Sequence, residues 1–208
     1  MHTFCHAVPG QWYQMGVMLS ATDSLNWLAS ITGTRPADLT GELGEALQAP
    51  GAVRFLPYLS GERTPHNDAV IRGSFTGLSA GTGRADLARA VVEGVSFGLR
   101  DSHEALKATG AELPSLIAIG GGARSRYWLK VLATVLDVPL DVPKDGEFGA
   151  ALGAARLGLV AATGRPATEV MTPPAMGDRI EPDRALTSAF DAAYEAFRKA
   201  YPGIRAIQ

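Results

Sequence analysis

Three consecutive glycines could bind an anionic ligand through the main chain. They end an apolar segment at 115–120, which we predict to be a buried strand, and a predicted helix over 124–136 follows them. Such a turn exposes backbone N–H groups, and the helix N-terminus adds partial positive charge. The pattern is neither a Walker loop nor a Rossmann fingerprint, and a tight turn without a ligand would use the same residues. The candidate binding residues are Gly120, Gly121, Gly122, Ala123, Arg124 and Ser125.

A second candidate is the charged loop at Gly61, Glu62 and Arg63, which could face a cleft. A salt bridge between Glu62 and Arg63 that holds the loop is the alternative. Asp145 and Glu147 are better explained as the acidic start of a helix at 147. We find no glycine-rich loop with a lysine and no convincing carboxylate pair, so we assign no catalytic residue to this chain.

Two other chemical patterns have simpler structural explanations. The G-x-S-x-G pattern of hydrolases occurs at 94–98, but it lies inside a predicted helix, where Ser96 cannot be exposed on a strained turn. His2, Cys5 and His6 lie on an apparent strand whose neighbours alternate faces, and no matching second pair exists. We therefore assign no metal site.

Small residues repeat on one face of two predicted helices. Ala90, Gly94 and Gly98 are four residues apart, as are Gly149 and Gly153. Small side chains let another element approach closely, so we predict tight packing on both faces. A ligand against these faces is the less favoured alternative.

Helices and strands alternate in the second half of the chain, which favours a parallel α/β arrangement. In the first half we predict a hairpin turning at Pro9-Gly10, a helix from Thr22 or Asp23 to about Ile31, and a strand that Pro57 places at an edge or end. The full set of predicted elements is a hairpin at 2–8 and 12–19, helices at 22–31, 36–47, 84–109, 124–136, 147–162 and 183–201, strands at 53–59, 115–120 and 138–142, and a long loop at 60–83.

Composition narrows the class of protein. The 208 residues are 46% hydrophobic and carry a net charge of -2, so a nucleic-acid partner is not expected. One cysteine excludes an intrachain disulfide. No apolar run is long enough for a membrane helix, and the N-terminus does not resemble a signal peptide. We expect a cytoplasmic protein without a membrane partner.

A longer motif identifies a family. Gly73, Phe75, Gly77 and Leu78 are followed, after seven residues, by Asp86-Leu87 and then by residues 90–93, Ala-Val-Val-Glu. This spacing resembles the second signature of the FGGY carbohydrate kinases. Residues 55–65 (FLPYLSGERTP), 120–128 (GGGARSRYW) and 149–155 (GAALGAA) look like corresponding segments of the xylulose kinases in that family. The resemblance covers about residues 2–201.

The resemblance implies an α/β fold: an actin-like, ribonuclease H-like lobe with a mixed sheet flanked by helices, incomplete at its N-terminus. Residues 1–164 would form the C-terminal kinase lobe, 165–182 a proline-rich linker, and 183–208 a helix packed on the lobe. Residues 120–125 would be the adenosine-binding turn. The family's sugar site, aspartate base and phosphate turns lie mainly in segments upstream of the match, so none can be assigned here.

The implied activity is transfer of a phosphoryl group from ATP, with Mg²⁺, to D-xylulose, by a whole enzyme of which this chain is an inactive part. One alternative is another kinase of the family, of the ribulose, gluconate or glycerol type. A non-catalytic nucleotide-binding or interaction module is the other. Because a sheet that lacks a strand exposes an unpaired edge, we also expect self-association into a homo-oligomer.

Overall fold

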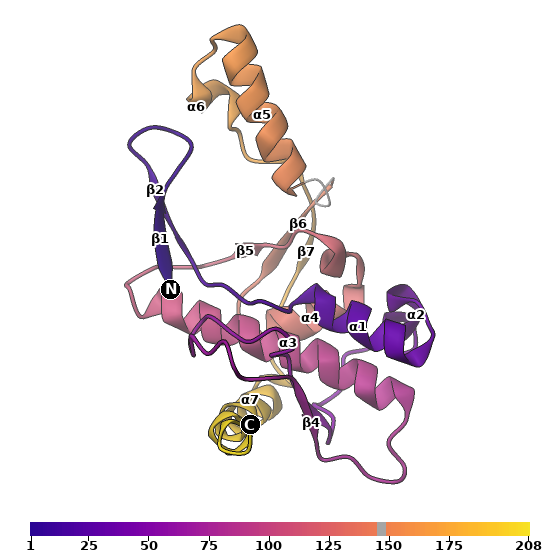
Figure 1. Cartoon of the computed structure of the whole chain (residues 1–208). Helices are drawn as coiled ribbons and strands as arrows, with labels where there is room; N and C mark the ends of the chain where they lie inside the picture. Colours follow the sequence, from indigo (N-terminus) through magenta and orange to yellow (C-terminus); the bar gives the residue numbers. More distant parts are fainter. Residues whose placement is uncertain (145–148) are drawn as a thin grey trace.

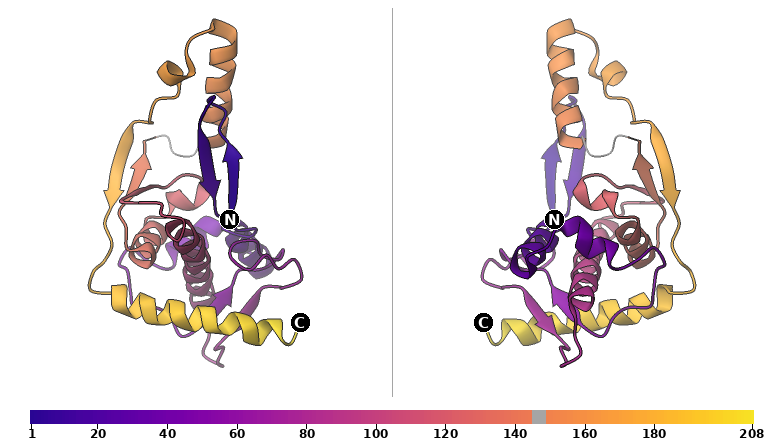
Figure 2. Two further views of the ribbon diagram at one scale, coloured as in Figure 1. Left: turned by 90° about the vertical axis from the view of Figure 1, so that its left-hand side faces the viewer. Right: turned by 90° about the vertical axis from the view of Figure 1, so that its right-hand side faces the viewer.

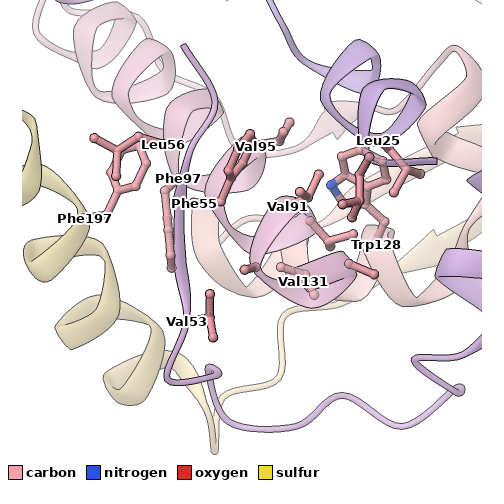
Figure 3. Close-up of a cluster of buried hydrophobic side chains, with 14 of the residues drawn as sticks. Leu25, Val53, Phe55, Leu56, Val91, Val95, Phe97, Trp128, Val131 and Phe197 are labelled. Atoms are coloured by element: carbon pink, nitrogen blue, oxygen red, sulfur yellow. The ribbon is translucent and has the colours of Figure 1, made fainter. Parts of the chain in front are cut away.

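A long central helix, α3 (Arg84–Lys107), organises the computed structural model, which describes residues 1–144 and 149–208. Helices and strands from both halves of the chain pack against α3 (Figure 1). Along α3, Val91, Val95 and Phe97 are almost fully buried and belong to the main hydrophobic core (Figure 3). The helix was predicted at 84–109, and the left-handed Gly110 follows it as expected.

The N-terminal segment forms the predicted hairpin. Strands β1 (His2–Cys5) and β2 (Trp12–Met15) pair antiparallel, with His2 opposite Met15 and Cys5 opposite Trp12. Helix α1 (Thr22–Thr32) follows and ends at Gly33, whose φ of 64° is the left-handed conformation that glycine adopts readily. Helix α2 (Pro36–Gly41) is shorter than the predicted 36–47.

A small sheet crosses α3. Strand β3 (Arg54–Leu56) ends just before Pro57, as that proline suggested, and pairs antiparallel with β4 (Ser74–Thr76). Strand β4 lies inside the segment predicted to be a loop. It was missed because three residues are too few to show a period, and its partner lies elsewhere in the chain.

The second sheet has the order β5-β6-β7 and is mixed. Strand β5 (Leu116–Ile117) pairs parallel with β6 (Leu140–Pro143), and β7 (Met176–Ile180) pairs antiparallel with β6. Two predictions need correction here. Part of the expected linker at 165–182 is this edge strand, together with the short helix α6 (Ala167–Val170). The predicted buried strand at 115–120 is short, and it is not fully buried, because Ile117 is 50% exposed.

Two elements extend from one end of the body. Helix α5 (Gly149–Thr163) and the β1–β2 hairpin both point away from it, whereas α7 (Thr187–Arg205) crosses the opposite end (Figure 2). The predicted start of α5 at 147, with Asp145 and Glu147, lies outside the described residues. Helix α7 packs through an apolar stripe at helical spacing, in which Phe190, Tyr194 and Phe197 are buried.

The small-residue prediction holds for α3 and only in part for α5. A Cβ atom at Gly94 would lie 2.1 Å from the carbonyl oxygen of Phe55, so β3 can cross α3 there only because the residue is glycine. At Gly149 a Cβ would lie 2.7 Å from Ile119 Cδ1, but at Gly153 it would meet nothing within 4 Å. Within the described residues, Gly153 therefore has no close packing partner.

Candidate functional site

The glycine turn connects β5 to α4 (Arg126–Leu136) through a short 3₁₀ helix, η1 (Gly121–Arg124). Gly120 has a φ of 88°, which favours glycine, so this residue allows the chain to turn after the strand. The Oγ atom of Ser125 accepts a hydrogen bond from the amide of Trp128 at 3.3 Å and so caps α4. The helix predicted at 124 therefore begins at residue 126, after the 3₁₀ turn.

The amides of Gly121 and Gly122 are the donors that the turn can offer to a ligand. The first amides of a helix have no acceptor within that helix. A Cβ atom at Gly121 would meet nothing within 4 Å, so its main chain is open to approach. By contrast, the amides of Ala123 and Ser125 are used inside the turn, bonding to the carbonyl oxygens of Gly120 and Gly122.

A pocket of about 570 Å³ lies at this turn. Four of the six candidate residues line it: Gly121, Gly122, Arg124 and Ser125. The remaining wall comes from α1, α2, the segment after α2 and the start of α4, namely Thr22, Leu25, Asn26, Pro36, Ala37, Thr40, Gly41, Gly44, Glu45, Arg126, Tyr127 and Trp128. We did not assign the α1 and α2 residues from the sequence, because nothing in their types or spacing distinguishes them from ordinary helix residues.

Trp128 fixes the α4 wall of the pocket. Its indole Nε1–H donates to Ser96 Oγ at 3.2 Å, and that hydroxyl donates to the carbonyl oxygen of Val92 at 2.8 Å. Leu25 of α1 lies beside Trp128 in the same core (Figure 3). Ser96, from the hydrolase-like pattern, is fully buried in α3, so it anchors the pocket wall and has no access to a substrate.

Polar contacts close the rim of the pocket. Arg126 pairs with Asp178 of β7 at 2.8 Å, and Lys130 Nζ donates to the carbonyl oxygen of Glu45 at 2.7 Å. The second contact joins α4 to the segment after α2. The pocket thus combines apolar walls with helix-start amides and two arginines, Arg124 and Arg126, an arrangement that suits a flat base attached to an anionic group.

The second candidate loop is built around a buried acid. Glu62 is 2% exposed, and its carboxylate accepts hydrogen bonds from the amides of Arg63 at 2.7 Å and Leu19 at 3.3 Å. Burial raises the pKa of Glu62 to about 7, and these two hydrogen bonds partly oppose the shift. The contact between Glu62 and Arg63 is thus a hydrogen bond to the main chain instead of a salt bridge.

Gly61 is required by the geometry of this loop. Its φ is 81°, and a Cβ atom would lie 3.0 Å from Asp68 O and Ala69 Cα. None of the three loop residues lines the pocket at the glycine turn. The structure therefore separates the two candidate sites that the sequence suggested.

His2, Cys5 and His6 lie on the hairpin, where Cys5 is exposed. Nowhere in residues 1–144 and 149–208 do three or more histidine, cysteine or acidic side chains gather as metal ligands do. Within the same ranges, no helix is long and apolar enough to cross a membrane.

Comparison with known proteins places the chain in a family. The C-terminal domain of the FGGY family of carbohydrate kinases matches residues 1–162. The chain belongs to the FGGY family of carbohydrate kinases. It is 42% identical over 204 residues to the xylulose kinase of Escherichia coli, covering 97% of this chain and 42% of that protein. The xylulose kinase of Klebsiella pneumoniae is 47% identical over 163 residues, which are 77% of this chain and 33% of that kinase.

A crystal structure of a xyloylose kinase from Brucella ovis superimposes on the whole chain with a TM-score of 0.92 and 55% identity, over 43% of the Brucella protein. This likeness confirms the predicted α/β, actin-like lobe. The FGGY chain spans less than half the length of the relatives that it matches.

Proposed function

We propose that this chain is the nucleotide-binding part of an ATP-dependent sugar kinase that phosphorylates D-xylulose to D-xylulose 5-phosphate. The observation that carries the proposal is the pocket at the glycine turn, in a chain of the FGGY family. The similarity to xylulose kinases supports D-xylulose as the sugar.

The pocket residues fit a nucleotide. Leu25, Pro36 and Trp128 provide apolar surface for a flat base. The amides of Gly121 and Gly122 would hold anionic oxygens where the 3₁₀ helix begins. ATP would supply the phosphoryl group when bound, and the role of these residues is to bind and orient it.

The chain itself supplies no identified base for the sugar hydroxyl. In phosphoryl transfer the protein contributes mainly positioning and charge neutralisation, and these need groups around both the phosphates and the acceptor. We also assign no Mg²⁺ ligand among the described residues, which form no cluster of metal-ligating side chains. We therefore expect the 208-residue chain to show no sugar-dependent ATP consumption, and xylulose phosphorylation by the purified chain would contradict this division of roles.

Titration with ADP tests the nucleotide site. In amide spectra of the ¹⁵N-labelled chain, the signals of Gly121 and Gly122 should shift first. Gly121→Val should abolish these shifts, since its side chain would occupy open space in front of the main chain and block a ligand's approach. Gly81→Val is the matched control, because Gly81 lies in an exposed loop away from the pocket. If saturating ADP shifted only signals outside the pocket, the assignment would be wrong.

Another sugar kinase of the family remains the second candidate, because most sugar contacts are expected outside this chain. A non-catalytic nucleotide-binding or interaction module is the third. Joining the chain to its upstream coding sequence and assaying D-xylulose, D-ribulose, gluconate and glycerol separates these candidates. A preference for D-xylulose supports the proposal, and activity on none of the four supports the module.

A further inference from the structure

The C-terminal end of α7 contacts the loop that contains Glu62. Asp68 of this loop accepts a hydrogen bond from the hydroxyl of Tyr201 at 2.9 Å and forms an ion pair with Arg205 at 2.6 Å. The other carboxylate oxygen of Asp68 accepts the amides of Val70 and Ile71 at 2.9 and 3.0 Å. Both oxygens are therefore engaged, one by the loop itself and the other by α7.

Aromatic stacking reinforces this contact. The rings of His66 and Tyr201 are 3.6 Å apart between centroids and inclined by only 9°. The hydroxyl of Tyr58 lies 3.2 Å from His66 Nε2, so the histidine is held between the end of β3 and α7. Helix α7 is a firm support, because Phe190, Tyr194 and Phe197 are buried along it. The Arg100–Asp191 ion pair at 2.6 Å is a separate contact with α3 in the opposite half of the helix.

The same loop holds the segment that enters α1. Glu62 and Asp68 exchange two main-chain hydrogen bonds of 2.8 Å each, so the position of Glu62 depends on that of Asp68. The Glu62 carboxylate then accepts the amide of Leu19. Thr64 is joined to Val17 twice, through its amide at 2.9 Å and its hydroxyl at 3.0 Å.

This segment leads directly into a wall of the pocket. Thr22, three residues after Leu19, is the first residue of α1 and lines the pocket. Thr22 and Gly122 line the same pocket, and a Cβ atom added at Gly122 would lie 3.7 Å from Thr22 Oγ1, so the start of α1 lies beside the glycine turn. A continuous series of contacts thus joins α7 to the pocket, although no residue of α7 lines it.

We propose that the C-terminal end of α7 is a positioning element for the pocket, acting through Asp68, Glu62 and Thr64 on the start of α1. Residues of α7 lie beyond the part of the chain that matches the FGGY C-terminal domain. What the pocket binds rests on the proposed function, whereas the positioning itself can be measured without a ligand.

Hydrogen exchange on the 208-residue chain tests the positioning. In Asp68→Ala, the protection of the Val17 and Leu19 amides should fall about tenfold, the factor expected when one hydrogen bond to a charged group is lost. Tyr201→Phe keeps the ring stack and removes only the hydroxyl, so a smaller fall at the same two amides is expected. Asp191→Asn is the control: it loosens the other end of α7 and should leave both amides unchanged.

The affinity for ADP provides the second measurement. It should be highest in the unaltered chain, lower in Tyr201→Phe and lowest in Asp68→Ala. Exchange at Val92 in α3 should stay constant and show that the core is intact. Unchanged protection at Val17 and Leu19, or an equal loss in Asp191→Asn, would overturn the inference. So would altered protection with unaltered ADP affinity. If the unaltered chain binds no ADP, the proposed function fails, and the exchange result alone decides whether α7 positions this wall.

Discussion

The substitution Gly94→Ala tests whether α3 and β3 need a glycine where they cross. The added Cβ atom would lie 2.1 Å from the carbonyl oxygen of Phe55, 3.0 Å from its carbonyl carbon and 3.3 Å from its Cβ atom. Phe55 is itself 1% exposed and is paired with Phe75 in the small sheet. The oxygen therefore cannot move aside without displacing β3 from its partner.

Two opposing contributions set the change in the free energy of unfolding that Gly94→Ala causes. Replacing glycine by alanine inside a helix gains about 1 kcal/mol. Overpacking a core costs about 1–3 kcal/mol and occasionally more, and a main-chain clash belongs at the upper end because no rotamer change relieves it. We expect a net loss of about 2 kcal/mol in the free energy of unfolding.

Urea unfolding followed by far-UV circular dichroism measures this loss. The urea concentration at the midpoint of unfolding should fall, while the dependence of the unfolding free energy on urea concentration stays unchanged. Gly98→Ala is the first control. Its Cβ atom would meet the terminal methyl of Met18 at 2.5 Å, and that flexible end can turn away, so a change within about 1 kcal/mol is expected. Gly153→Ala meets nothing within 4 Å and should raise only the local helicity of α5. A midpoint for Gly94→Ala equal to or above that of the unaltered chain would refute the reasoning.

Three further predictions concern the acid in the loop, the tryptophan in the pocket wall and the exposed hairpin. Because the folded state keeps the Glu62 proton up to about pH 7, the stability from Glu62 is full below about pH 4.5 and falls by about 3 kcal/mol as pH rises through 7. Glu62→Gln should remove this slope in urea midpoints measured from pH 4.5 to 8, and an unchanged slope would contradict the assignment. Trp128→Phe should cost about 1 kcal/mol of stability, because Ser96 loses one donor and keeps Val92 as its acceptor. Phe4, Trp12 and Tyr13 are 42%, 67% and 43% exposed on the hairpin, so the chain should self-associate in sedimentation at rising concentration, and a monomer throughout the micromolar range would argue against it.

Much of the local structure was predictable from neighbouring residues alone. Pro9-Gly10 defined the hairpin, Gly33 ended α1, and a helical period placed Phe190, Tyr194 and Phe197 on the buried stripe of α7. These features depend on the conformation of turn residues and on the spacing of apolar residues, and both can be recognised in short stretches of sequence. The glycine turn was predictable in the same way, because a strand, a left-handed residue and a helix follow one another directly.

Only the tertiary structure decided what surrounds that turn. Leu25 and Pro36 reach the pocket because α1, α2 and α4 all pack on α3, contacts between segments far apart in sequence that no local pattern encodes. Strands β4 and β7 were missed for a related reason, since each is defined by hydrogen bonds to a distant partner. The clearest case is Glu62: its residue type predicts an ordinary surface acid, but the fold buries its carboxylate against the amides of Leu19 and Arg63, and the loss of water raises its pKa. Burial and long-range pairing are properties of the assembled chain, so the sequence determined the turn and the structure determined its surroundings.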